Sequence, residues 1–445
     1  MTEADRRAAP SVREGALKKI AAWMTLLLYR SVEVHERYEA TESGPQLGVS
    51  NHFGGFADPL ILAHALDRVP RFIARDVIWR YPLAKQVMEF ARAIPVHKRE
   101  DKGPKGNDQM FRSTYAALAE GDLVVIFPEG ITVDDPSIAP IKTGAARIAL
   151  GAHANGVSGI EIVPIGIHYE DKATLRSKVF VYVGDPLDLE AEIATHTGRD
   201  AEDASTDRDS VDDLTEAIEE RLRRAAPDFT DWREARALNR AAAVSIRSAE
   251  GMESEVDYGD QSRLAAMLAQ SPPEGKRVVI DAMDVYAEDL DAVGVDDAEM
   301  VDSLESGWSF TMRLLWNILL GILLLPFAAI GLLINALPMA LLWLVGRIKA
   351  APAMMATVKP LAAILLFGIT WVVFIWRAAN VEGLGGSAIW VVLLPLYLFA
   401  LLAVVERVQL IWRALSGWVR SRRGGLRDVI LEHRRDVVES VADAL

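Results

Sequence analysis

The C-terminal third of the chain contains three long apolar runs, and these restrict the fold more than any other feature. They cover residues 314–345, 361–376 and 388–405. About 20 consecutive apolar residues are enough for a helix to cross a bilayer. As one helix, the first run would be roughly 48 Å long, against a hydrocarbon core of about 30 Å. Because Pro326 and Pro338 interrupt it, we expect two short helices folded into a hairpin.

Basic residues flank these runs unevenly. They are Arg313, Arg347, Lys349 and Lys359 around the first run, and Arg407, Arg413, Arg420, Arg422 and Arg423 after the third. The loop 377–387 holds only Arg377 and Glu382 as charged residues. Because basic loops stay on the cytoplasmic side, we expect both ends of the membrane part to be cytoplasmic and the number of crossings to be even. The pattern leaves open whether either hairpin spans the bilayer fully.

Upstream of residue 228, short apolar strands alternate with helical stretches, which predicts an α/β layer. The expected strands are 46–51, 71–75, 93–97, 122–127, 160–168 and 178–183. The expected helices are 59–67, 77–90, 107–120, 141–154 and 211–224, with an exposed acidic segment over 189–209. Residues 232–305 show further helical stretches at 233–248, 261–269 and 275–292 but no catalytic motif.

His52 and Asp58 lie at a junction between a predicted strand and a predicted helix. Asp58 is the expected N-cap and Pro59 the first helical residue. Gly54 and Gly55 permit a tight turn, which can bring Asp58 back to His52. A carboxylate on one imidazole nitrogen fixes the tautomer, and the other nitrogen can then take a proton from an alcohol. A surface pair without function is the alternative that these residues alone leave open.

Three further sequence blocks follow this one in order. Residues 93–99 (Ala-Ile-Pro-Val-His-Lys-Arg) form the second, residues 127–130 (Phe-Pro-Glu-Gly) the third, and residues 162–167 (Ile-Val-Pro-Ile-Gly-Ile) the fourth. Together with the Asn-His…Asp block they resemble the phospholipid/glycerol acyltransferase family. The resemblance covers roughly residues 30 to 225, and the order of four blocks makes it specific.

The resemblance implies acyl transfer from a thioester to an alcohol, with His52 as general base and Asp58 as its orienting partner. It places the cations for the acceptor's phosphate at Lys98 and Arg99. Lys142 and Arg147, at the start of a predicted helix, are second choices. The expected substrate-binding residues are Asn51, Lys98, Arg99, Phe127, Pro128, Glu129, Gly130, Thr132 and Lys142. No Gly-x-Ser-x-Gly elbow is present, so direct transfer without an acyl-enzyme is the simpler route.

Two departures from the family pattern concern the acceptor. Five residues separate His52 from Asp58, where the commonest pattern has four. This longer form is similar to a subgroup of glycerol-3-phosphate and related acyltransferases with C-terminal membrane segments. Ile131 and Thr132 follow the Glu-Gly pair, where many relatives have Thr-Arg. One familiar phosphate-binding arginine is therefore missing.

Composition excludes several classes of protein and site. The formal net charge of −14 argues against a nucleic-acid partner. The chain has no cysteine, which excludes disulfides, thiolate zinc sites and a cysteine nucleophile. We expect no metal site, because the Asp pairs 134–135 and 212–213 read as solvated. The remaining single histidines considered, His64, His97, His153 and His168, read as packing or surface residues.

The expected fold is an α/β domain of the glycerolipid acyltransferase type with a mixed, mostly parallel sheet, followed by a helical connector and an all-α C-terminal membrane domain. The segments are an amphipathic membrane-surface helix (1–30), the acyltransferase domain (31–228), the connector (229–307), a membrane domain of two helical hairpins (308–424) and a cytoplasmic helical tail (425–445). For residues 17–29 a plain core helix is the alternative to a helix lying on the membrane.

The expected reaction moves a fatty acyl group from acyl-CoA or acyl carrier protein to a hydroxyl of a glycerol-phosphate lipid precursor, without a further cofactor. The first choice of acceptor is 1-acylglycerol 3-phosphate, giving phosphatidate, followed by glycerol 3-phosphate or another lysolipid. A multi-pass membrane protein with its active domain on the cytoplasmic face follows from the flanking charges. A membrane scaffold or transporter without catalysis is the rival class, and the intact His52/Asp58 pair weighs against it.

Overall fold

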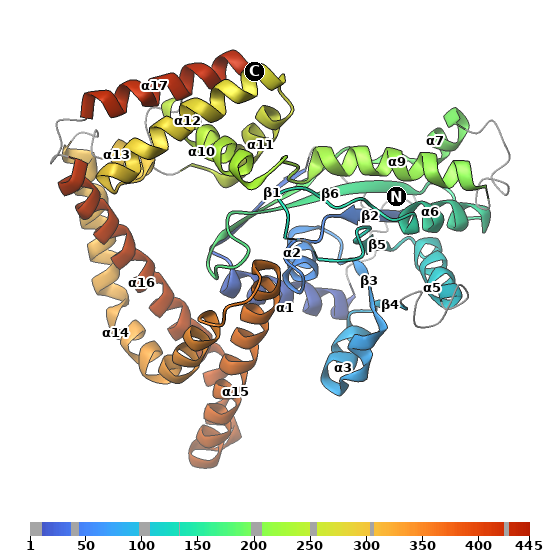
Figure 1. Cartoon of the computed structure of the whole chain (residues 1–445). Helices are drawn as coiled ribbons and strands as arrows, with labels where there is room; N and C mark the ends of the chain where they lie inside the picture. Colours follow the sequence, from blue (N-terminus) through green and yellow to red (C-terminus); the bar gives the residue numbers. More distant parts are fainter. Residues whose placement is uncertain are drawn as a thin grey trace, which may run out of the picture. The chain divides into compact units, whose positions relative to one another are not determined.

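The computed structural model describes residues 11–36, 44–97, 107–132, 134–196, 207–249, 256–302, 307–421 and 427–445 (Figure 1). The chain divides into two compact units. Unit 1 comprises Met1–Asp228 with Ala351–Thr357, and unit 2 comprises Phe229–Ala350 with Val358–Leu445. Each unit is described separately below.

Unit 1 is an α/β domain. Its strands are β1 (Ser31–Glu36), β2 (Gln46–Ser50), β3 (Arg71–Arg75), β4 (Ile94–Val96), β5 (Leu123–Ile126), β6 (Glu161–Tyr169), β7 (Lys178–Val183) and β8 (Leu187–Asp188). Its helices are α1 (Val12–Leu28), α2 (Ala57–Ala65), the 3-10 helix η2 (Asp76–Arg80), α3 (Pro82–Phe90), α5 (Asp108–Ala119), α6 (Gly144–Ala154), α7 (Leu189–His196) and α9 (Arg208–Ala225).

The strands form one mixed sheet in the order β1-β7-β6-β2-β5-β3-β4, with β8 paired to β6. Strands β6, β2, β5, β3 and β4 are parallel to one another, and β7 is antiparallel to β6. The predicted mixed, mostly parallel sheet is therefore confirmed. Parallel strands need crossover connections, which is why helices separate them along the chain.

Helices cover both faces of this sheet (Figure 1). The apolar sides of α5, α6 and α9 pack on one face, where Leu47, Ile148 and Ile218 are fully buried. Helices α1 and α2 pack against each other and lie below the strands in this view. The central strand β2 is buried along its whole length, as expected of a strand with helices on both sides.

Helix α1 buries one side and exposes apolar residues on another. Ala21 and Leu28 are buried, whereas Ile20, Trp23 and Leu26 are 39–49% exposed. Ser11 and Glu14 close a capping box at its start, which fixes where the helix begins. The helix is thus confirmed, and its position on a membrane surface stays a prediction.

One expectation for unit 1 was wrong in detail. Helix α2 begins at Ala57 with Phe56 as N-cap, so Asp58 is not the cap. The Asp58 carboxylate instead bonds the backbone of the preceding turn, which leaves it unavailable for capping. Two elements were not predicted: strand β1, which alternates Val32 and Val34 with polar residues, and helix α7 within the acidic segment 189–209.

Unit 2 begins with a helical bundle. Its helices are α10 (Trp232–Ala249), α11 (Tyr258–Ala269), α12 (Pro273–Val293), α13 (Asp297–Asp302) and α17 (Arg427–Ala444). One apolar core contains residues from α10, α12 and α17, including Leu238, Tyr286 and Val437, all less than 1% exposed. The C-terminal helix therefore completes the core of the segment that precedes the membrane helices.

A buried cluster of charged and polar side chains joins α17 to the other helices of this bundle. Arg434 donates from Nε to Asp297 Oδ1 at 2.8 Å, and the hydroxyl of Tyr286 donates to the same oxygen at 2.7 Å. Arg247 pairs with the other oxygen of Asp297. Because buried charges are costly unless they are paired and hydrogen-bonded, this arrangement selects one docking of α17.

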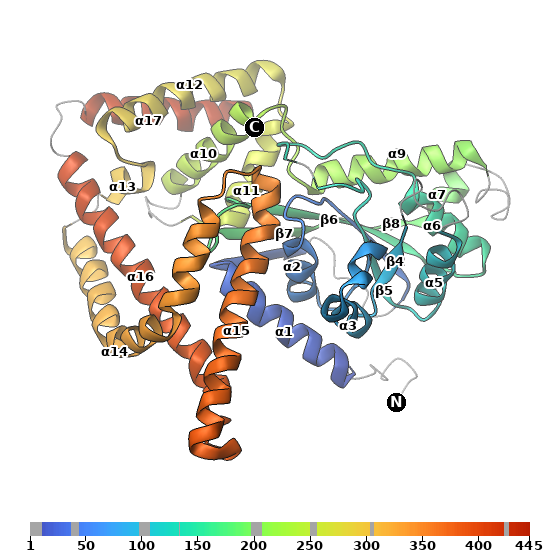
Figure 2. The same ribbon diagram turned by 60° about the horizontal axis from the view of Figure 1, so that its bottom comes forward.

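Three helices of unit 2 are long and apolar enough to cross a membrane by length and composition. They are α14 (Gly307–Gly346), α15 (Pro352–Ser387) and α16 (Trp390–Ser421). The expected division of residues 314–345 into two separate short helices was wrong, because α14 continues as one helix through Pro326 and Pro338. The ribbon bends along its course (Figure 2). A proline removes one helical hydrogen bond and kinks a helix without having to end it.

Candidate active site

Three neighbouring parallel strands bring the predicted motif residues together. Val49 of β2 is in register with Ile126 of β5, and Ser50 of β2 with Ile165 of β6. The carboxyl ends of β2 and β5 therefore lie side by side, and the last residues of β6 run past the end of β2. The turns after parallel strands are where α/β proteins bind ligands.

His52 and Asp58 form the expected pair. His52 Nδ1 lies 2.8 Å from Asp58 Oδ2. Because a carboxylate can only accept here, Nδ1 carries the hydrogen and Nε2 has a free lone pair. The His52 side chain is 21% exposed, while the Asp58 side chain is fully buried. Within the described part of the chain, no group hydrogen-bonds Nε2, so this nitrogen is available to a substrate hydroxyl.

The Asp58 carboxylate has further donors that sequence reasoning missed. The Gly54 N–H donates to it at 3.0 Å, and the hydroxyl of Tyr169 donates to Oδ1. Tyr169 is the last residue of β6, and Tyr29 follows α1 directly. The only sequence signal for Tyr169 was its place just after a predicted strand, next to the fourth motif block.

Phe127 supports the imidazole from one side. Its ring stacks on that of His52, with centroids 4.3 Å apart and planes 18° from parallel. Phe72 of β3 stacks on Phe127 in turn, at 6.3 Å. The turn that follows is closed by a hydrogen bond from the Gly130 N–H to the Phe127 carbonyl, with Gly130 at φ +67°. Pro128 is buried within this turn, and Thr132 beyond it is exposed.

Glu129 is positioned differently from the acceptor contact that the resemblance implied. Its side chain is buried, with 1% of the residue exposed. One carboxylate oxygen accepts the His52 N–H at 2.8 Å and the other the Ala139 N–H at 3.0 Å. Burial raises the pKa of Glu129, and these two backbone donors oppose that rise. With both oxygens occupied, Glu129 holds the backbone of His52.

Asn51 is likewise a support and does not face a substrate. It is fully buried, and its side-chain amide exchanges two hydrogen bonds with the Ile167 backbone. Nδ2 donates to the Ile167 carbonyl at 3.0 Å, and Oδ1 accepts the Ile167 N–H at 2.7 Å. These bonds extend the pairing of β2 with β6 by one residue and fix the start of the turn that carries His52.

Cationic groups near the site come from two described lysines. A Cβ built on Gly130 would lie 2.4 Å from Lys142 Nζ, so this ammonium sits over the Pro-Glu-Gly turn. Lys172, which sequence reasoning missed, lies 5.7 Å from the Phe53 ring centroid and pairs with Asp134 at 2.8 Å. Arg147 is exposed on α6. Lys98 and Arg99 lie outside the described residues.

The other histidines named above play structural parts where the structure describes their contacts. His168 is buried and donates from Nε2 to the Ala225 carbonyl at 2.8 Å, which joins β6 to the end of α9. Burial lowers the pKa of His168 to about 4, so it is neutral at ordinary pH. His97 pairs with Asp76 at 2.8 Å. Among the described residues, no group of three or more His, Asp or Glu side chains could hold a metal.

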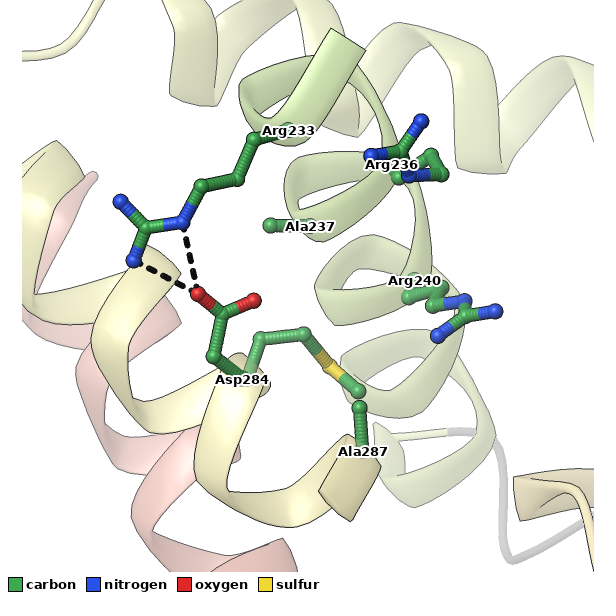
Figure 3. A pocket seen from close by; sticks show the side chains of 7 residues that line it. Arg233, Arg236, Ala237, Arg240, Asp284 and Ala287 are labelled. Carbon is green, nitrogen blue, oxygen red and sulfur yellow. Dashed lines mark hydrogen bonds and ion pairs between the residues drawn. The ribbon is translucent and has the colours of Figure 1, made fainter. Parts of the chain in front are cut away.

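A small cavity of about 80 Å³ lies elsewhere, between α10 and α12 of the bundle (Figure 3). Arg233, Arg236 and Arg240 line it from α10, and Arg233 bonds Asp284 of α12 at 2.8 Å. Ala237 and Met283 contribute apolar lining. Its one carboxylate, Asp284, is ion-paired with Arg233, and no histidine lines the cavity, so the candidate active site is the one around His52.

Comparison with known proteins agrees with this assignment. Residues 31–168 match the family described as Acyltransferase. Glycerol-3-phosphate O-acyltransferase 2 of Saccharomyces cerevisiae is 39% identical over 82 residues, which are 18% of this chain and 11% of the yeast protein. The lyso-ornithine lipid O-acyltransferase of Rhizobium meliloti is 32% identical over 147 residues, 32% of this chain and 47% of that protein.

The chain thus spans less than half the length of each of these relatives. Among solved structures, the 1-acyl-sn-glycerophosphate acyltransferase of Thermotoga maritima aligns with 48% of this chain and 78% of its own, at 19% identity and a TM-score of 0.35. The family match covers the strands and turns that carry His52, Asp58 and Glu129. Residues 31–168 of this chain are therefore similar to the Acyltransferase family, and the relatives matched include glycerolipid acyltransferases.

Proposed function

We propose that this protein transfers a fatty acyl group from an acyl thioester, on CoA or acyl carrier protein, to a hydroxyl of a glycerol-phosphate lipid precursor. The observation that carries the proposal is the state of His52. Its Nδ1 is held by Asp58 at 2.8 Å, and its Nε2 has no protein partner among the described residues. A fixed imidazole with an open nitrogen is what a general base for an alcohol requires.

The reaction needs one proton acceptor. As the acceptor hydroxyl attacks the thioester carbonyl, Nε2 of His52 takes its proton and the new C–O bond forms. The C–S bond then breaks and the thiol group leaves as a thiolate, which takes up a proton from the imidazolium or from water. Asp58 stabilises the imidazolium while it exists, as a carboxylate does in other His-Asp pairs.

We propose 1-acylglycerol 3-phosphate as the first acceptor and glycerol 3-phosphate as the second. The two relatives named above are a glycerol-3-phosphate O-acyltransferase and a lysolipid O-acyltransferase. Their names support an acceptor that is either glycerol 3-phosphate or a lysolipid. Lys142, whose ammonium lies over the Pro-Glu-Gly turn, is the described cation that we assign to the acceptor phosphate. Lys98 and Arg99 are proposed to join it.

We also propose that the enzyme works at a membrane, with the α/β domain on the cytoplasmic face. Three helices long and apolar enough to cross a bilayer support the membrane location. The basic residues that flank them support the orientation. An amphiphilic acceptor could then reach the site from the bilayer.

The test is an assay of the purified full-length protein in lipid nanodiscs with radiolabelled acyl-CoA or acyl carrier protein. The acceptor panel contains 1-acylglycerol 3-phosphate, glycerol 3-phosphate, lyso-ornithine lipid and lysophosphatidylcholine. We expect a labelled product with a phosphate-bearing acceptor and none with His52→Ala. The matched control is His433→Ala, which removes a histidine paired with Asp289 at 2.5 Å in the helical bundle of unit 2.

Two results would contradict the proposal. One is a wild-type protein that yields no product with any donor and acceptor, which would favour the scaffold. The other is a His52→Ala protein that retains most of the wild-type rate. Equal loss in His52→Ala and His433→Ala would show a general effect on the preparation and would remove His52 from the role.

A further inference from the structure

We propose that Tyr169 is a positioning residue of the catalytic pair, holding the Asp58 carboxylate in the orientation that His52 needs, with Tyr29 holding Tyr169. The inference rests on the proposed function and deepens it. Neither tyrosine belongs to the motif blocks that led to the site.

The two oxygens of Asp58 have separate tasks. Oδ2 binds Nδ1 of His52 at 2.8 Å, and Oδ1 accepts the hydroxyl of Tyr169. The Gly54 N–H, at 3.0 Å from each oxygen, does not distinguish them. Among the described contacts of Asp58, the hydrogen bond from Tyr169 is therefore the one that distinguishes the oxygen turned away from His52. It fixes the rotation of the carboxylate about its Cβ–Cγ bond.

Tyr29 packs against Tyr169 from the end of α1. The two ring centroids are 5.9 Å apart, with the ring planes 51° from parallel. Because the Tyr169 hydroxyl gives its one hydrogen to Asp58, any hydrogen bond between the two tyrosines has Tyr29 as its donor. Tyr29 is 2% exposed, so water has little access to this contact.

Both hydroxyl groups stay protonated at ordinary pH. Burial raises the pKa of Tyr169 well above its usual value, and the charge of Asp58 raises it further. Burial and the same charge raise the pKa of Tyr29. The Tyr169 hydroxyl therefore acts as a hydrogen-bond donor at ordinary pH. The arrangement does not depend on ionisation of either tyrosine.

Gly54 provides the space for this contact. A Cβ at this position would lie 2.1 Å from the Tyr169 hydroxyl oxygen and 2.6 Å from Asp58 Oδ1. Any other residue would have to push the tyrosine and the carboxylate apart. The position of β6 beside β2, with Ser50 in register with Ile165, brings Tyr169 to this turn.

The hydroxyl of Tyr169 also affects the strength of the base. A donor on Oδ1 draws negative charge away from the oxygen that faces His52. Removing it strengthens the attraction between Asp58 and the imidazolium, which stabilises the protonated form of the imidazole. Loss of the hydroxyl should thus lower the rate through poorer orientation and move the acidic limb of the pH profile to higher pH.

The experiment compares Tyr169→Phe with wild type and with Tyr182→Phe in the full-length protein. Tyr182 lies on β7, stacks on His35 and gives the same loss of one oxygen outside the site. We expect Tyr169→Phe to lower kcat about tenfold, a part of the 10²- to 10⁴-fold that a general base contributes, with KM within about twofold. The acidic limb should shift upward, and Tyr29→Phe should shift it in the same direction by less.

A second readout needs no turnover. The rate at which diethyl pyrocarbonate modifies His52, followed by peptide mass spectrometry at a series of pH values, reports how readily its imidazole gains a proton. Tyr169→Phe should move this pH dependence to higher pH and Tyr182→Phe should not. This separates the two proposals: inactive wild-type protein with the shift present would overturn the proposed function alone. Unchanged kcat, pH limb and His52 titration in Tyr169→Phe would overturn the positioning role.

Discussion

Glu129 and His52 are joined by a hydrogen bond of 2.8 Å from the backbone N–H of the histidine to the buried carboxylate of the glutamate. The other carboxylate oxygen accepts the Ala139 N–H at 3.0 Å. The turn after β5 therefore carries the support for the turn after β2. This relationship gives the Pro-Glu-Gly block a structural reason to accompany the His…Asp block, since the glutamate positions the backbone of His52.

Replacing Glu129 with alanine should destabilise the protein and lower its activity. Two buried N–H groups would lose their acceptor, at roughly 1–3 kcal/mol each. Glutamine keeps one acceptor oxygen and should cost about half as much. Thermal unfolding in detergent measures the effect, with exposed Glu216→Ala on α9 as the matched control. A Tm for Glu129→Ala equal to that of Glu216→Ala would contradict the assigned role.

Replacing Gly54 with alanine should damage the site through crowding. The added Cβ would lie 2.1 Å from the Tyr169 hydroxyl oxygen, and overpacking of this kind costs about 1–3 kcal/mol. We expect kcat to fall about tenfold or more in the transfer assay, given that a 1.36 kcal/mol change in barrier is tenfold in rate. Gly144→Ala is the control, because its Cβ would meet nothing closer than 3.7 Å. Full activity in Gly54→Ala would show that Asp58 needs no such space.

The buried His168 should make the stability of the protein depend on pH. Burial lowers its pKa to about 4, against 6.5 for an ordinary histidine, so the unfolded chain binds a proton at higher pH than the folded chain. Stability should be complete above pH 6.5 and fall by up to about 3 kcal/mol as the pH drops toward 4. The free energy of unfolding, measured across this pH range for wild type and for His168→Leu, isolates the contribution of His168. If both proteins show the same slope, His168 is not its source.

The helical bundle of unit 2 predicts an even number of membrane crossings. Residues before α14 and after α16 share one core, so both ends of the membrane segment lie on one face of the bilayer. With α15 and α16 crossing once each, α14 has to return to the face from which it entered. At about 1.5 Å per residue its 40 residues measure about 60 Å, enough for a helix that bends at its prolines to enter the bilayer and return.

The absence of cysteine makes this topology directly measurable. Single-cysteine variants Glu274→Cys on α12, Glu439→Cys on α17 and Lys349→Cys between α14 and α15 should react with an impermeant maleimide from one face. Gly385→Cys, near the C-terminal end of α15, should react from the other. Labelling of Lys349→Cys from the face opposite to Glu274→Cys would mean that α14 crosses once.

Much of this protein was predictable because the relevant information is local. The alternation of apolar strands and helices, the glycine turn between His52 and Asp58, and the long apolar runs are properties of neighbouring residues. Periodicity and turn chemistry act over a few positions, so the mixed sheet and the membrane helices followed from them. The pairing of His52 with Asp58, six positions apart, was within the same range.

The rest depended on which strands and helices became neighbours. Tyr169 reaches Asp58 across 111 positions only because β6 lies parallel to β2, and Arg434 closes the bundle from 137 positions beyond Asp297. Asp58 was expected to cap α2, but its carboxylate bonds Tyr169 and Gly54. The sequence by itself determined the elements and the pairing of His52 with Asp58. The tertiary structure decided the supports of that pair, because burial and long-range contacts do not exist until the sheet has formed.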